Sequence, residues 1–185
     1  MMMNRHGFIC LAIGVSLVAI TATGQAQQQK ATTADSKYIA KVNTAAPKAI
    51  VKDATIVAMN KDGTMRTLQK GTNEFTCMVM ANGTPMCADE GGMEWAHALM
   101  SHSAPPNKVG FMYMLNGDTG ASNTDPYATG KTTDNHWVKT GPHVMILGPA
   151  VRTMDGYPRT PDADPTEPSV MWAGTPYEHL MIPVR

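Results

Sequence analysis

Residues 77–87 of this chain read CMVMANGTPMC, with one cysteine at each end. The middle of the segment, residues 81–83 (ANG), has the composition of a three-residue hairpin loop in which Gly83 is left-handed. Such a loop places Cys77 and Cys87 on facing strands. We therefore expect a hairpin tied by a disulfide, which contributes about 3 kcal/mol or slightly less through loop closure. A redox-active pair is the alternative, although its usual spacing is Cys-x-x-Cys.

Strand patterns continue on both sides of this hairpin. Residues 54–59 and 64–69 are short β-like runs joined by Asn-Lys-Asp-Gly, which is a hairpin signal. Residues 109–115 and 143–147 are apolar on both alternating faces, a pattern typical of central strands. Further strands are expected at residues 75–80, 170–172 and 179–184.

One segment has the character of a helix. Residues 93–100 contain good helix formers and no breaker, and Pro105 and Pro106 follow them, so we expect a helix near residues 92–101. Together with the strands, this segment predicts an α+β fold. We expect a single compact domain, mainly antiparallel β-sheet, with a disulfide-tied hairpin and one or two short helices.

The first 26 residues have the pattern of an export signal. Arg5 supplies a basic start, residues 8–20 are mostly apolar, and residues 24–26 (GQA) form a small-x-small cleavage site. The apolar run is too short to span a bilayer, although an uncleaved membrane anchor is the alternative. Cleavage removes Cys10 and leaves two cysteines for an oxidising compartment. We expect a periplasmic or secreted protein.

The chain after the expected signal divides into two parts. Residues 27–37 are polar and without periodicity, so we expect a disordered lead-in, followed by a single globular domain over residues 38–185. Removing Arg5 leaves 14 basic and 15 acidic side chains, a net charge of −1. This balance argues against nucleic acid as a partner. No other segment is long and apolar enough for membrane insertion after signal cleavage, so the expected partner is a protein or a small ligand.

Two segments near the C-terminus share the pattern His-x-Met-Ile. Residues two apart in a strand share a face, so His143 and Met145, and likewise His179 and Met181, would lie side by side. If the strands are neighbours, two imidazoles and two thioethers could converge, a set that suits copper or another soft metal. The alternative is packing, because the chain without its signal has thirteen methionines and methionine fills irregular cores.

The long polar segment at residues 116–135 is the leading candidate for function. Loops of this length on a rigid scaffold often bind ligands, and Asp118, Asn123 and Asp125 are its candidate contacts. A disordered segment or an Ω-loop is the alternative that the composition equally allows. The chain has none of the nucleophile, zinc-protease or phosphate-loop signatures. We therefore expect a non-catalytic binding module.

An enzyme is the remaining alternative. It would use His143 or His179 with a carboxylate from Glu178, Asp118 or Asp125, because imidazole titrates near neutral pH and a carboxylate could orient it.

The chain also resembles a group of exported bacterial proteins of uncharacterised function. The resemblance is carried by the cysteine segments at residues 71–77 and 85–89 with Trp95, by residues 121–126 (ASNTDP), by residues 141–146, and by the ending from residue 170 to 183. It covers most of the chain after the signal and implies export. It implies no particular activity.

Overall fold

The structure is a computed structural model and describes residues 32–184, which form one compact unit. The expected signal peptide, residues 1–26, lies outside the described residues. The helices are α1 (Thr33–Val42), α2 (Lys48–Val51), α3 (Glu90–Met100) and the 3-10 helix η1 (Pro149–Thr153). The strands are β1 (Thr55–Met59), β2 (Met65–Gln69), β3 (Thr76–Val79), β4 (Pro85–Ala88), β5 (Gly110–Met114), β6 (Ala121–Ser122), β7 (Trp137–Val138), β8 (His143–Leu147), β9 (Ser169–Met171) and β10 (His179–Pro183).

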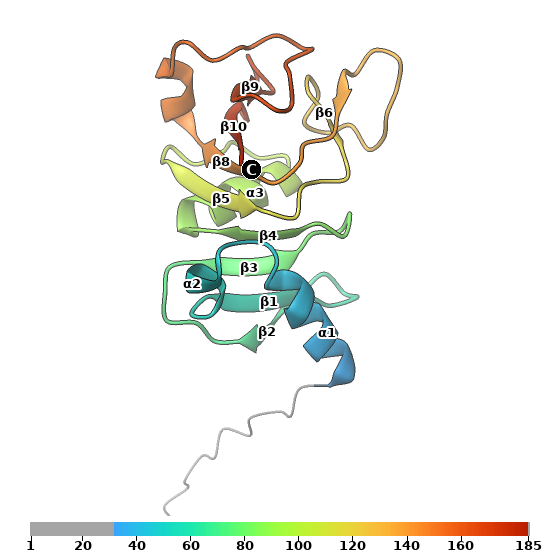
Figure 1. Cartoon of the computed structure of the whole chain (residues 1–185), viewed down its shortest axis with the longest axis vertical. Coiled ribbons are helices and arrows are strands. Elements are labelled where there is room, and N and C mark those ends of the chain that lie inside the picture. The colour runs from blue at the N-terminus through green and yellow to red at the C-terminus, as the bar shows by residue number, and fades with distance from the viewer. Residues whose placement is uncertain (1–31, 185) are drawn as a thin grey trace, which may run out of the picture. The chain divides into compact units, whose positions relative to one another are not determined.

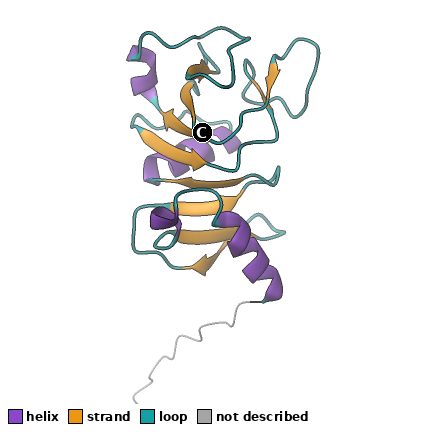
Figure 2. Ribbon diagram, in the orientation of Figure 1, coloured by secondary structure: helices purple, strands orange, loops and turns teal. Residues whose placement is uncertain are grey.

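An eight-stranded sheet runs through the described residues in the order β2-β1-β3-β4-β5-β8-β10-β9 (Figures 1 and 2). All neighbouring pairs are antiparallel except β1 and β3. β6 and β7 form a separate two-stranded ladder. The α+β prediction with a mainly antiparallel sheet is confirmed, with three short α-helices where one or two were expected.

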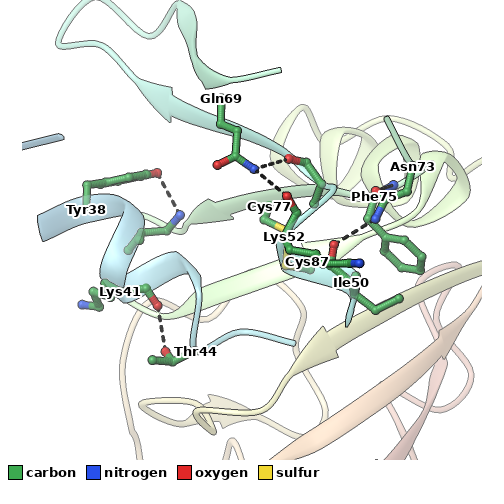
Figure 3. Close-up of a disulfide and its surroundings, with 12 residues drawn as sticks. Tyr38, Lys41, Thr44, Ile50, Lys52, Gln69, Asn73, Phe75, Cys77 and Cys87 are labelled. Carbon is green, nitrogen blue, oxygen red and sulfur yellow. Dashed lines mark hydrogen bonds between the residues drawn. A yellow bond between two sulfur atoms is a disulfide. The ribbon is translucent and has the colours of Figure 1, made fainter. Parts of the chain in front are cut away.

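The disulfide hairpin is formed as predicted. Cys77 lies directly opposite Cys87 and is bonded to it, with the Cα atoms 4.0 Å apart. Gly83 has φ +85°, the left-handed conformation that the three-residue loop requires. Figure 3 shows the disulfide beside the segment of Ile50 and Lys52, with Tyr38 and its helix to one side. The Tyr38 hydroxyl accepts a hydrogen bond from the Val79 N–H at 2.9 Å. The disulfide therefore joins two strands that are already covered by the rest of the fold.

The predicted disordered lead-in is wrong over its described part. Helix α1 begins at Thr33, and a capping box forms before it, with the Thr32 hydroxyl accepting from Asp35 N–H and the Asp35 carboxylate accepting from Thr32 N–H. Reciprocal capping satisfies two backbone donors that would otherwise have no partner. The Tyr38 hydroxyl also donates to the Val57 carbonyl at 2.9 Å. The folded part of the chain therefore begins before residue 38. Residues 27–31 lie outside the described part.

The helices cover opposite faces of the sheet. One core cluster joins Val42 of α1 and Val51 of α2 to Cys77 and Cys87. A second cluster joins Trp95 of α3 to the methionine-bearing face of the same strands. Because neighbouring strand residues point to opposite faces, the disulfide and the methionines are separated by the sheet itself.

Helix α3 lies unusually close to β5. It begins at Glu90 rather than after the glycine pair, because the Asp89 side chain caps it by accepting from Gly92 N–H at 2.7 Å. A Cβ on Gly110 would lie 2.4 Å from the Gly92 nitrogen, and one on Gly91 would lie 2.4 Å from the Val109 carbonyl oxygen. The glycines are thus required by the close approach of helix and strand, which brings α3 over the methionine face.

Candidate binding cavity

Methionines occupy one continuous face of the sheet. Met112 on β5, Met145 on β8 and Met181 on β10 are consecutive cross-strand partners. Met78 on β3 is paired in the same way with Met86 on β4. Directly opposite residues have Cβ atoms about 5 Å apart, so these thioether side chains contact one another across the strands.

A cavity of about 530 Å³ lies over this face. Ten of the thirteen methionines outside the predicted signal line it. Six come from the central strands: Met78, Met86, Met112, Met114, Met145 and Met181. The others are Met59, Met80, Met100 and Met171. The high methionine content of this chain is therefore concentrated around one space.

Aromatic side chains form a second wall of the cavity. Trp95 of α3 stacks on Trp172 with ring centroids 5.9 Å apart, and His179 meets both rings edge-on at 5.3 and 4.8 Å. Trp172 has φ 54°, a conformation that is strained for a bulky residue. Two hydrogen bonds hold it there, from its indole N–H to the Ser122 carbonyl at 2.7 Å and from its backbone N–H to the Asn123 carbonyl at 3.1 Å.

The long polar segment at residues 116–135 forms part of the lining of this cavity. Its ordered start includes β6, which pairs with β7, and Asp118, Pro126 and Tyr127 are among its residues that line the space. The Tyr127 ring stacks on His102, just after α3, with centroids 4.1 Å apart. The loop is thus in contact with the segment that follows α3.

The three candidate contacts of this loop have different positions. Asp118 lines the cavity, and its Oδ1 accepts from the N–H groups of Gly120 and Thr140 at 2.8 and 3.1 Å. Asn123 is buried and donates to the carbonyls of residues 160 and 161, which is a structural tie. Asp125 accepts from Tyr127 N–H at 2.8 Å within a turn. Only Asp118 of the three faces the cavity.

His143 and His179 both line the cavity and are 1 % and 2 % exposed. Each ring uses Nδ1 for a backbone carbonyl, that of Gly141 at 2.7 Å and that of Tyr177 at 3.0 Å. A carbonyl accepts but does not donate, so Nδ1 carries the proton and Nε2 keeps its lone pair. Burial lowers the pKa of His143, and burial lowers the pKa of His179 to about 4 with a smaller contribution from His143. Both rings are neutral at pH 7.

The His-x-Met strands are neighbours, and all four side chains share one face as expected. The register pairs Met145 with Met181 but places His143 opposite Pro183. The two histidines are therefore offset by four residues, about 13 Å along the strand, on opposite sides of the methionine pair. Within residues 32–184, no three His, Cys, Asp or Glu side chains gather as a metal-binding group.

Of the three carboxylates expected as partners for a histidine, Glu178 is engaged elsewhere. Glu178 is buried and forms ion pairs with Arg159 at 2.9 Å and Arg152 at 3.3 Å. In the described part of the chain, the hydrogen-bond partners of His143 and His179 are the carbonyls of Gly141 and Tyr177. Within the described residues, neither imidazole is hydrogen-bonded to a carboxylate, although Asp118 lies near enough to His143 to favour its charged form.

The sequence patterns identified only part of this site. His-x-Met pointed to Met145 and Met181, but Met78, Met112 and Met114 were missed. The signal that could have found them is Met-x-Met, which occurs at residues 78–80 and 112–114 and places two thioethers on one face of a strand. Comparison with protein-family models, curated proteins and solved structures found no match for this chain.

Proposed function

We propose that this chain is an exported, non-catalytic binding protein that holds a small apolar molecule in the methionine-lined cavity. The observation that carries the proposal is the cavity itself, which has a volume of about 530 Å³ and in whose lining methionine is the commonest residue, with two tryptophans beside it. This volume is within the range of small-molecule sites, which are concave and mostly apolar with a few polar groups.

The lining also indicates the character of the ligand. Of the described residues that line the cavity, Asp118 is the only one with a carboxylate, and none is lysine or arginine. Methionine side chains are unbranched and adaptable, and their sulfur atoms make favourable contacts with aromatic rings. We expect a neutral ligand with an aromatic or aliphatic body, whose hydroxyl or amino group could donate to Nε2 of His143 or His179.

Export is part of the proposal. The Cys77–Cys87 disulfide is of the kind that persists in oxidising compartments, and this supports a periplasmic or secreted location. Within the described residues, no helix is long and apolar enough to cross a membrane. N-terminal sequencing of the protein from the cell envelope or medium checks this part, and a chain still carrying residues 1–26 would contradict it.

The ligand proposal is tested with N-phenyl-1-naphthylamine, a neutral apolar probe whose fluorescence rises in apolar surroundings. Ala96 of α3 lines the cavity, so Ala96→Phe should fill part of it and weaken probe binding about tenfold, equivalent to 1.4 kcal/mol. The matched control is Ala104→Phe, at an exposed position outside this lining. Equal probe affinity in the two variants would overturn the proposal.

A further inference from the structure

We propose that one end of the cavity binds a soft monovalent metal ion, Cu(I), through Nε2 of His143 and the thioethers of Met114 and Met145. This inference goes beyond the binding of an apolar molecule and does not depend on it.

The three side chains are brought together by the sheet. Met114 on β5 is the direct cross-strand partner of His143 on β8. Met145 is two residues further along β8 and on the same face. These relationships put the Cβ atoms of Met114 and Met145 about 5 and 7 Å from that of His143, within reach of flexible thioethers. All three side chains line the cavity.

The imidazole of His143 already has the tautomer that a metal ligand bound through Nε2 requires. Its Nδ1–H donates to the Gly141 carbonyl at 2.7 Å, which fixes the tautomer and directs the lone pair to Nε2. Metal-binding histidines in general use their second nitrogen in this way, because the hydrogen bond fixes the ring orientation and raises the basicity of the ligand.

The ligand types select the ion. Thioether sulfur is a soft ligand that favours Cu(I), and imidazole also binds copper, whereas Mg²⁺ and Ca²⁺ require several oxygen ligands. The cavity offers one carboxylate, that of Asp118, which lies close enough to His143 to act on its charge. With three neutral ligands and one nearby negative charge, a monovalent cation is balanced and a divalent one is not.

The structure also revises the ligand set that the His-x-Met pattern suggested. His179 lies four residues away in register and packs edge-on against Trp95 and Trp172. Met114, from a strand that the pattern did not include, takes its place beside His143.

The test is a competition for Cu(I) with bicinchoninate in ascorbate, under argon, using the full chain after signal cleavage. Ascorbate leaves the Cys77–Cys87 disulfide intact, so cysteine thiolates do not contribute, and a thiol assay checks this. We expect one equivalent of Cu(I) to transfer from the chelator to the protein. Retention of all copper by the chelator would overturn the proposal.

The variant Met114→Leu/Met145→Leu removes both sulfurs while keeping apolar volume, so the fold should persist. We expect its Cu(I) affinity to fall about tenfold or more. The matched control, Met112→Leu, removes one thioether from the same face and should bind Cu(I) as the unmodified chain does. An equal loss in the control would contradict the assignment of ligands.

The two proposals remain separable in this design. Leucine preserves the apolar lining, so N-phenyl-1-naphthylamine should still bind the variant that has lost Cu(I). Loss of Cu(I) binding with the probe retained supports the metal site. Loss of both from the folded variant would show that the thioethers serve only to shape the cavity and would overturn the metal site.

Discussion

Met145 on β8 lies directly opposite Met181 on β10, and its other neighbour in the same row is Met112 on β5. Three unbranched thioether side chains therefore lie side by side across three strands where branched aliphatic residues are usual. Because methionine has three rotatable side-chain bonds, this row of side chains can change shape more easily than a row of valine or isoleucine. A cavity lined by such side chains can bind ligands of different shape.

Removing the disulfide should lower stability by about 3 kcal/mol, because the unfolded chain regains the entropy that the cross-link had removed. The change is Cys77→Ala together with Cys87→Ala, both at fully buried positions. Urea unfolding without reductant measures it. An unchanged free energy of unfolding would mean that the covered hairpin is held by its neighbours alone.

Gly110→Ala should destabilise the protein by about 1–3 kcal/mol, the usual cost of forcing extra atoms into a packed site. The new Cβ would lie 2.4 Å from the Gly92 backbone nitrogen, so helix and strand must separate. Thermal unfolding measures the change. Gly130→Ala is the matched control, since its Cβ meets nothing within 4 Å. Equal stability of the two variants would refute the close approach of α3 to β5.

Stability should fall as the pH is lowered below about 6.5. The pKa of His179 is lowered to about 4 by burial, so between these values the unfolded chain binds the proton and the folded chain does not. The free energy of unfolding therefore rises with pH across this window, by up to about 3 kcal/mol from this group. His143, whose pKa is also lowered by burial, acts in the same direction.

Chemical unfolding at pH 4.5, 5.5, 6.5 and 7.5 measures this dependence. In the variant His179→Asn, the free energy of unfolding should change less steeply with pH. Its amide can still donate a hydrogen bond to the Tyr177 carbonyl. A slope identical to that of the unmodified chain would show that another group causes the pH dependence.

Tyr127→Ala should loosen the polar loop at residues 116–135, because it removes the ring that stacks on His102. Amide hydrogen exchange across residues 116–135 should speed up, while exchange in the central strands stays unchanged. Tyr157→Ala is a matched control, since Tyr157 and Tyr127 are 39 % and 41 % exposed. Equal exchange in both variants would mean that the loop is held by its other contacts.

Local turn chemistry made much of the fold predictable. The Asn-Gly and Asp-Gly loops and the alternating apolar runs located both N-terminal hairpins and the central strands. Helix α1 was missed because its polar composition looked unstructured, although Thr32 and Asp35 form a capping box. The start of α3 was misplaced because two glycines usually interrupt a helix, whereas here they allow contact with Gly110.

The site was less predictable than the fold. Period-two alternation by itself determined that His143 shares a face with Met145 and that His179 shares one with Met181, because side-chain direction in a strand is a local property. Which strands are neighbours, and in what register, is set by burial of whole faces and by chain connections over long distances. Only the tertiary structure therefore decided that Met114 lies beside His143, that His179 lies apart among tryptophans, and that the methionines enclose a single cavity.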